Sequence, residues 1–318
     1  MSFLLSKDNK SLLNKKKNKI HKIKIVSFYK YFYISKPELF RDFIHINFNK
    51  MNILGRVYIS FEGINAQISV PLVFYHKMKL FIYLLKSELN NLYMNLALSY
   101  SKIPFNKLYV RIKKQIVSDG IICNKFNNKN NGIYLNAIEV NNIIEDSSAV
   151  LVDMRNYYEY EIGHFVNSIN VRAKTFKQQM QDILSLLIKF KNKKILMYCT
   201  GGIRCEKSTS LLLNNNFKNV YHIKGGILKY LRDVHKFNLP NYFQGKLFVF
   251  DARMIEDYSN NIISSCHQCN NLCDTYINCK NSSCHLLFIQ CKYCRNSLDK
   301  YCSLACKYNF FNKTYNLL

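Results

Sequence analysis

The spacing of apolar residues divides the chain into three parts. Between residues 25 and 117, short runs rich in β-branched and aromatic residues alternate with stretches of helical spacing. We expect strands at 25–34, 56–60, 65–70, 92–100 and 108–117, and helices at 37–51 and 72–87. Two helices on a small, mostly antiparallel sheet form the split βαβ pattern of a ferredoxin-like, or acylphosphatase-like, α+β domain.

The middle of the chain has a different rhythm. Residues 118–132, which become rich in Asn and Lys from 124 onward, predict a linker. From 133 to 240, strands expected at 149–154, 194–198 and 219–223 alternate with helices expected at 175–190, 204–214 and 226–234. Strands that alternate with helices predict an α/β domain, in which helices cover both faces of a parallel sheet.

The two ends of the chain are less regular. Residues 1–24 hold eight Lys against one Asp, which predicts a basic arm. This arm either contacts RNA or is a solvated tail without a specific role. Residues 241–318 are rich in Cys and short of long periodic segments. A chain of 318 residues is too long for one ordinary core, so we expect several domains.

Composition and charge narrow the class of protein. No run of 18 apolar residues and no secretion signal is found, so we expect a cytoplasmic protein without a membrane span. A formal net charge of +26 favours a polyanionic partner such as nucleic acid. The chain is also rich in residues of A/T-rich codons, and mutation bias alone could raise the charge. The charge therefore supports RNA binding only together with a motif.

One loop combines the features of a reactive thiol. The buried-strand run 194–198 ends directly before Cys199, and the expected helix follows a Gly-containing loop. Backbone N–H groups at a helix N-terminus can turn toward an anion and lower the pKa of a Cys. We expect Cys199 to be the catalytic residue, unless it is a buried structural Cys before an ordinary turn. The supporting residues are Thr200, Gly201, Gly202, Ile203 and Arg204.

A second thiol lies six residues further along the chain. Cys205 could resolve a sulfenic acid or persulfide on Cys199 as a disulfide. It could equally be a small buried residue of the helix, which is the commonest fate of a free Cys. The sequence favours neither role.

Motifs on both sides of the loop carry a resemblance to a known domain. Asp153-x-Arg155, then Glu159-Tyr160-x-x-Gly163-His164, precede the Cys loop, and Gly225-Gly226 follow the next strand. This order resembles a single rhodanese domain. The resemblance implies that the loop Cys carries a persulfide or acts as a bare nucleophile. It also implies that Asp153, Arg155 and His164 belong to the scaffold.

Longer strings extend the resemblance over residues 25–306. They are SFYKYF at 27–32, GRVY at 55–58, EGINAQISV at 62–70, YCTGGIRCEKS at 198–208, CHQC at 266–269, NCKN at 278–281 and CHLLFIQC at 284–291. Together they resemble the rhodanese-related tRNA uridine hydroxylase family. That resemblance implies oxygen-dependent hydroxylation at C5 of the wobble uridine, which gives 5-hydroxyuridine. It also implies molecular oxygen as co-substrate and the tRNA anticodon loop, rather than DNA, as partner.

Nine of the 12 Cys residues crowd into residues 266–306. Two C-x2-C pairs are separated by 21 residues, and a C-x3-C pair follows. The expected metal ligands are Cys266, Cys269, Cys291, Cys294, Cys302 and Cys306. Cys273, Cys279 and Cys284-His285 lie between these pairs, so that nine thiols suffice for two four-thiol sites with one to spare. Structural zinc is the favoured interpretation, followed by an iron–sulfur cluster and then a redox disulfide relay.

Two functions of different classes remain open at this point. In the first, the chain is a tRNA uridine hydroxylase with Cys199 as its reactive thiol. In the second, it is a rhodanese-type sulfurtransferase or persulfide carrier that passes sulfur to a partner. The sequence contains no GxGxxG nucleotide motif, no His-Glu-x-x-His and no obvious facial metal triad. It therefore does not predict how oxygen would be activated.

Overall fold

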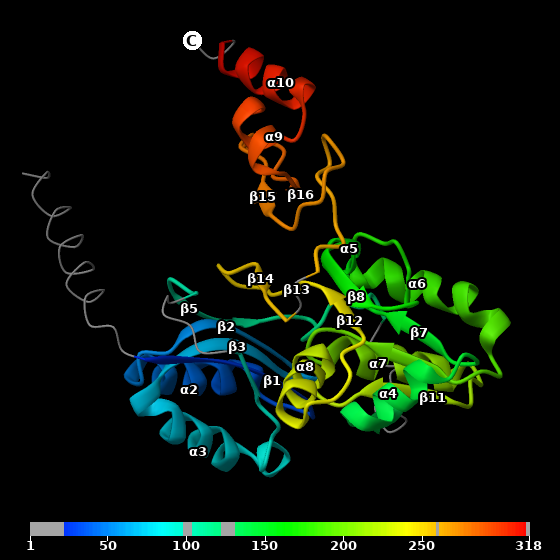
Figure 1. The fold of residues 1–318 in the computed structure, drawn as a ribbon. Coiled ribbons are helices and arrows are strands. Elements are labelled where there is room, and N and C mark those ends of the chain that lie inside the picture. The colour runs from blue at the N-terminus through cyan, green and yellow to red at the C-terminus, as the bar shows by residue number, and fades with distance from the viewer. Residues whose placement is uncertain (1–21, 98–103, 122–130, 259–260, 316–318) are drawn as a thin grey trace, which may run out of the picture. The chain divides into compact units, whose positions relative to one another are not determined.

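The structure is a computed structural model that describes residues 22–97, 104–121, 131–258 and 261–315 (Figure 1). Most of the predicted basic arm, and the Asn- and Lys-rich part of the predicted linker, lie outside the described residues. The chain forms two compact units, one up to Ile116 and one from Val117.

The first unit is a five-stranded sheet with two helices. Strands β1, β3 and β2 pair antiparallel, β4 pairs antiparallel with the other edge of β1, and β5 joins β2 in parallel. The order β4-β1-β3-β2-β5 is the ferredoxin-like order with a fifth strand added, which confirms the predicted fold. The elements are β1 (Ile23–Tyr31), α2 (Pro37–Lys50), β2 (Leu54–Ser60), β3 (Gly63–Pro71), α3 (Tyr75–Leu85), β4 (Asn95–Leu96) and β5 (Leu108–Ile112).

Apolar residues of both helices pack on this sheet. Ile44 and Phe48 of α2 and Ile82 of α3 are fully buried in one cluster with the sheet. The strand predicted at 108–117 ends at Ile112, because the chain then turns back toward β3 and the turn that precedes β3. There the backbone of Ile116 accepts a hydrogen bond from Asn65 and donates one to the carboxylate of Glu62.

The second unit begins with a five-stranded parallel sheet in the order β6-β11-β10-β7-β9. This confirms the α/β domain predicted from the alternation of strands and helices. Its strands are β6 (Ile133–Leu135), β7 (Val150–Asp153), β9 (Ile169–Asn170), β10 (Ile195–Tyr198) and β11 (Val220–Ile223). Its helices are α4 (Ala137–Glu145), α5 (Tyr157–Ile162), α6 (Phe176–Leu187), α7 (Ile203–Asn214) and α8 (Gly226–Phe237).

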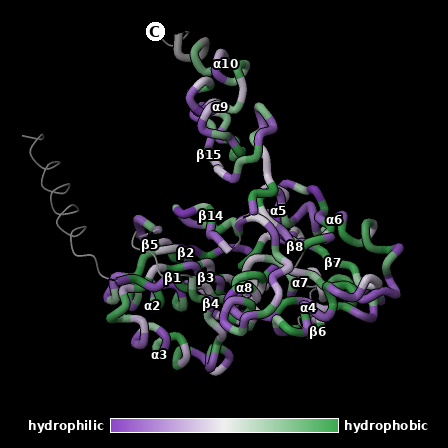
Figure 2. The backbone as a smooth tube through the Cα atoms, viewed as in Figure 1, coloured by the Kyte–Doolittle hydropathy of each residue, from purple (hydrophilic) through white to green (hydrophobic). Residues whose placement is uncertain are grey.

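Alternating residues of the central strand β10 are buried against the helices on opposite faces of the sheet. Leu196 and Tyr198 join the cluster that contains residues of α4 and α8. Ile195 and Met197 join the cluster that contains residues of α6 and α7. Because both faces are covered, the strands are mostly hydrophobic runs, as β7 shows (Figure 2).

Several short elements of this unit were not predicted. Helix α4 begins with a capping box of Asn136 and Glu139, and at the start of α5 the Asn156 N–H donates to the carboxylate of Glu159. Asn three residues before Glu is a local signal that could have located both helices. Strands β8 (Gly163–Phe165) and β12 (Phe243–Gly245), which pair antiparallel, are too short for a periodic signal.

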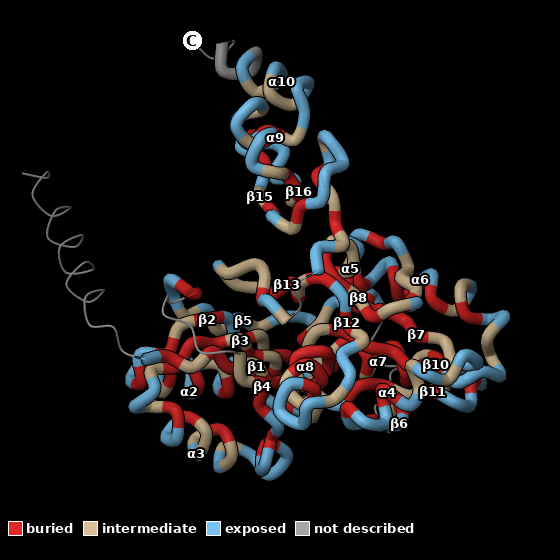
Figure 3. Tube along the Cα trace, in the orientation of Figure 1, coloured by how far each residue is buried: buried red, intermediate tan, exposed pale blue. Residues whose placement is uncertain are grey.

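The end of the chain has few buried residues (Figure 3). Its elements are β13 (Leu247–Phe248), β14 (Ile255–Glu256), β15 (Tyr276–Asn278), β16 (Leu287–Ile289), α9 (Lys292–Ser297) and α10 (Leu304–Tyr315). Helix α10 is 12 residues long, in a region whose sequence is short of long periodic segments. Two small clusters, around Ile289 and around Phe288, are its apolar cores.

Candidate active site

Cys199 lies where the sequence places it, directly after β10 and before α7. Its side chain is 1% exposed. Gly202 adopts φ 101°, in the left-handed region that favours glycine, and caps the N-terminus of α7. The Gly202 N–H then points back and donates to Cys199 Sγ at 3.2 Å. The loop therefore surrounds the sulfur with the positive end of a helix.

The Gly-Gly motif after β11 holds this loop from its other side. The N–H groups of Ile227 and Leu228 donate to the carbonyl oxygens of Cys199 and Thr200 at 3.0 and 3.2 Å. A Cβ on Gly226 would lie 2.5 Å from the Thr200 oxygen, so a side chain there would push α8 away. The loop carbonyls thus accept from the N-terminus of α8, while the Gly202 N–H of the loop donates to the sulfur. These contacts explain physically why the Gly-Gly motif and the Cys loop occur together in the rhodanese pattern.

The surroundings of Cys199 favour its thiolate form. Burial by itself would raise the pKa of this thiol. The Cys205 thiol, the charge of Arg204 and the backbone N–H groups of Cys205 and Arg204 outweigh burial and lower the pKa of Cys199 from 9.0 to about 6. Burial and the neighbouring thiolate raise the pKa of Cys205 well above its ordinary value, so that Cys205 stays a hydrogen-bond donor.

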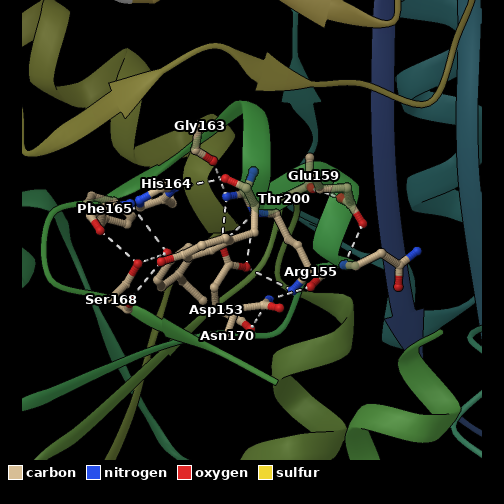
Figure 4. Close-up of polar contacts among 12 residues, drawn as sticks. Asp153, Arg155, Glu159, Gly163, His164, Phe165, Ser168, Asn170 and Thr200 are labelled. Carbon is tan, nitrogen blue, oxygen red and sulfur yellow. Dashed lines mark hydrogen bonds and ion pairs between the residues drawn. The ribbon is translucent and has the colours of Figure 1, made fainter. Parts of the chain in front are cut away.

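Arg204 is not a free charge in the loop. Its guanidinium forms a bidentate ion pair with Glu159 of α5, with N–O distances of 2.6 and 2.9 Å. The Thr200 hydroxyl also donates to Glu159, at 3.1 Å (Figure 4). Glu159 is fully buried. In the sequence it stands within the Glu159-Tyr160-x-x-Gly163-His164 motif, which by itself assigns it no role. The structure therefore adds Glu159 to the site as the residue that positions Arg204 and Thr200.

Asp153 and Arg155 lie beneath the loop as a fully buried ion pair (Figure 4). Asp153 accepts from the Arg155 side chain and from its backbone N–H, and Asn170 donates to both backbone carbonyls. His164 stacks on Tyr160 with ring centroids 3.9 Å apart, and burial lowers its pKa, which favours the neutral ring. These contacts agree with the scaffold role that the resemblance implied for all three residues.

The Cys-rich region brings eight thiols together in two groups. Cys266, Cys269, Cys291 and Cys294 form the first group, as the two C-x2-C pairs predict. Cys302 and Cys306 do not form a site with either of those pairs. They gather with Cys279 and Cys284, two residues absent from the predicted ligand set. In each group the four sulfur atoms all lie within 4.8 Å of one another.

A parallel sheet with a thiolate loop at its carboxyl edge, held between two helix N-termini, defines a rhodanese domain, and residues 136–233 match the family model for a rhodanese-like domain. Residues 23–116 match an UPF0176 acylphosphatase-like domain, and residues 244–307 match a rhodanese C-terminal domain.

Curated relatives match most of the chain. The tRNA uridine(34) hydroxylase of Buchnera aphidicola subsp. Acyrthosiphon pisum (strain Tuc7) is 52% identical over 90% of this chain and 89% of its own length. That of Buchnera aphidicola subsp. Schizaphis graminum is 51% identical over 96% of this chain and 98% of its own length. That of Erwinia tasmaniensis is 47% identical over 88% of this chain and 80% of its own length. The chain therefore belongs to the tRNA uridine(34) hydroxylase family. Among the described residues, no helix is long and apolar enough to span a membrane.

Proposed function

We propose that this chain hydroxylates C5 of uridine 34 in tRNA, with molecular oxygen as co-substrate and Cys199 as the reactive thiol. One observation carries the proposal. The similarity to tRNA uridine(34) hydroxylases spans nine-tenths of the chain, and within it the loop holds Cys199 with a pKa of about 6. A thiol with that pKa is mostly thiolate at pH 7, the form that attacks.

A thiolate suits the chemistry of the base. Uracil C5 is a poor nucleophile until a group adds to C6, and a thiolate can add there and leave again. Addition places electron density on C5, which takes up one oxygen atom of O₂. The C5 proton and the thiolate then leave, and the second oxygen atom leaves as water with two electrons and two protons from an external reductant. The Gly202 N–H and the α7 N-terminus supply a positive field, to which the charge of Arg204 adds although Arg204 is paired with Glu159. Since Cys199 is 1% exposed, its surroundings must open to admit the base.

The rest of the chain suits an RNA substrate. With 46 Lys and Arg against 20 Asp and Glu, the chain attracts phosphates at ordinary salt concentrations. Uridine 34 lies in the anticodon loop, and proteins read single-stranded loops by splaying bases into a pocket. A tRNA substrate supports the cytoplasmic location that we propose.

Nucleoside mass spectrometry of tRNA tests the proposal. Cells that lack the gene are complemented with the wild-type chain, with Cys199→Ser or with Cys273→Ser, a buried Cys outside the active site. We expect 5-hydroxyuridine with the wild type and Cys273→Ser, and none with Cys199→Ser. Loss of a thiouridine in place of 5-hydroxyuridine would instead support the sulfur carrier. Normal 5-hydroxyuridine with Cys199→Ser would contradict the role of Cys199.

A further inference from the structure

We propose that residues 266–306 bind two Zn²⁺ ions in two interleaved tetrathiolate sites. The first site is Cys266, Cys269, Cys291 and Cys294, and the second is Cys279, Cys284, Cys302 and Cys306. Along the chain, pairs of ligands alternate between the sites. Each ion therefore ties together segments that enclose ligands of the other ion.

The sulfur spacing fits one tetrahedral ion in each site. A tetrahedron with Zn–S bonds of about 2.3 Å has S–S edges of about 3.8 Å. The distances are 3.7 Å for Cys269–Cys291, 3.7 Å for Cys279–Cys306 and 3.8 Å for Cys284–Cys302. A disulfide bond measures about 2.05 Å, so these sulfurs are not bonded to each other. A cubane cluster carries each Cys on a different iron and would space the sulfurs more widely.

Hydrogen bonds to the sulfur atoms support thiolate ligands. The N–H of Cys291 lies 3.4 Å from Cys266 Sγ, and the N–H of Cys294 lies 3.4 Å from Cys291 Sγ. In the second site, Asn281 Nδ2 lies 3.2 Å from Cys306 Sγ. Each Zn²⁺ would replace the thiol protons, which pass to solvent, and these donors would share the remaining negative charge.

The region also has little else to hold it together. Among the described residues, the buried members of the second apolar cluster are Cys279, Phe288 and Tyr301, and two of the eight proposed ligands are exposed. A core of this size does not offset the entropy of ordering some 40 residues, and small domains of this kind need a metal or disulfides. Because all eight thiols are free, metal ions are the staples that the structure accommodates.

The ninth Cys of the region provides a matched control. Cys273 is buried, belongs to neither site, and its sulfur accepts a hydrogen bond from the Thr275 N–H at 3.5 Å. It packs in the same apolar cluster as Cys266 and Cys294. Replacing it therefore disturbs the same region without removing a ligand.

The first site is also connected to the active site. His267, between two of its ligands, lies 2.9 Å from Glu161, and the Tyr276 hydroxyl donates to the Tyr158 carbonyl at 2.7 Å. Both contacts fall on α5, the helix that carries Glu159. Zinc in the first site would thereby help to position the partner of Arg204.

Elemental analysis of the full chain, purified under reducing conditions, tests the proposal. We expect two zinc per chain in the wild type and in Cys273→Ser, and at most one in Cys269→Ser and in Cys284→Ser. Replacing zinc with Co²⁺ in the wild type should give the absorption of a tetrahedral thiolate complex. This measurement and the wild-type stoichiometry remain decisive if the ligand variants fail to fold.

Three outcomes would overturn the proposal. One is a wild-type chain with one zinc or none. Another is iron together with labile sulfide, which would indicate a cluster. The third is zinc loss in Cys273→Ser equal to that in Cys269→Ser, which would show that the sites depend on general folding and not on the assigned ligands.

Discussion

The hydrogen bond from Cys205 to Cys199 can be removed without touching the reactive thiol. Cys205→Ala deletes the donor at a position that is 1% exposed, where water cannot replace it. A hydrogen bond to a charged group contributes about 1.5–3 kcal/mol, and one pKa unit corresponds to about 1.4 kcal/mol. We therefore expect Cys205→Ala to raise the pKa of Cys199 from about 6 to roughly 7–8. At pH 7, the thiolate fraction falls from about nine-tenths to between about a half and a tenth.

Cys205→Ser separates the two roles left open by the sequence. A hydroxyl keeps the donor, so the pKa of Cys199 should stay close to 6. A hydroxyl cannot form a disulfide. If Cys205 acts only as a donor, Ser restores the activity that Ala loses. If Cys205 resolves an oxidised Cys199, both variants lose activity although Ser preserves the pKa.

NMR of protein labelled with ¹³C at cysteine Cβ measures this pKa without requiring access to the buried sulfur. The Cys199 resonance is assigned by its absence from Cys199→Ser. The stability carries the same signature. Because the folded-state pKa is lowered, the thiolate stabilises the fold fully above the ordinary thiol pKa of 9.0, and this contribution disappears as pH falls through about 6. An unchanged Cys199 pKa in Cys205→Ala would refute the hydrogen-bond explanation.

Three further predictions concern the loop and its supports. Glu159→Gln leaves the buried Arg204 without its counter-charge and should lower the free energy of unfolding in urea by roughly 3 kcal/mol. The control Glu161→Gln, on the same helix, should lower it by about 1 kcal/mol or less. Equal losses would contradict the role of Glu159. In Gly226→Ala, the new Cβ meets the Thr200 carbonyl and the residue must keep φ 68°, so we expect the free energy of unfolding to fall by about 2 kcal/mol or more, with loss of activity. A variant of normal stability would refute the close approach of α8. tRNA containing 5-fluorouridine should form a covalent complex through Cys199 on a denaturing gel, because fluorine blocks the usual exit; absence of the complex, under conditions where ordinary tRNA is modified, would argue against addition to C6.

Local patterns carried most of the sequence prediction. The Cys199 loop, its flanking strand and helix and the Gly-Gly motif are contiguous signals, and the structure places them as expected. The partner of Arg204 was missed because Glu159 lies 45 residues away and nothing in its local sequence points to that contact. Cys279 and Cys284 were missed for a related reason. Four pairs of thiols can combine in several ways, and only the folded chain shows which pairs meet.

Growth of cells under ¹⁸O₂ tests the central claim most directly. The gene-deleted strain carries either the wild-type chain or Cys199→Ser, and the nucleosides of its tRNA are analysed by mass spectrometry. We predict 5-hydroxyuridine at position 34 whose hydroxyl oxygen is ¹⁸O with the wild type, and unmodified uridine with Cys199→Ser. A hydroxyl oxygen from water, or labelled 5-hydroxyuridine made by the Cys199→Ser chain, would contradict the account.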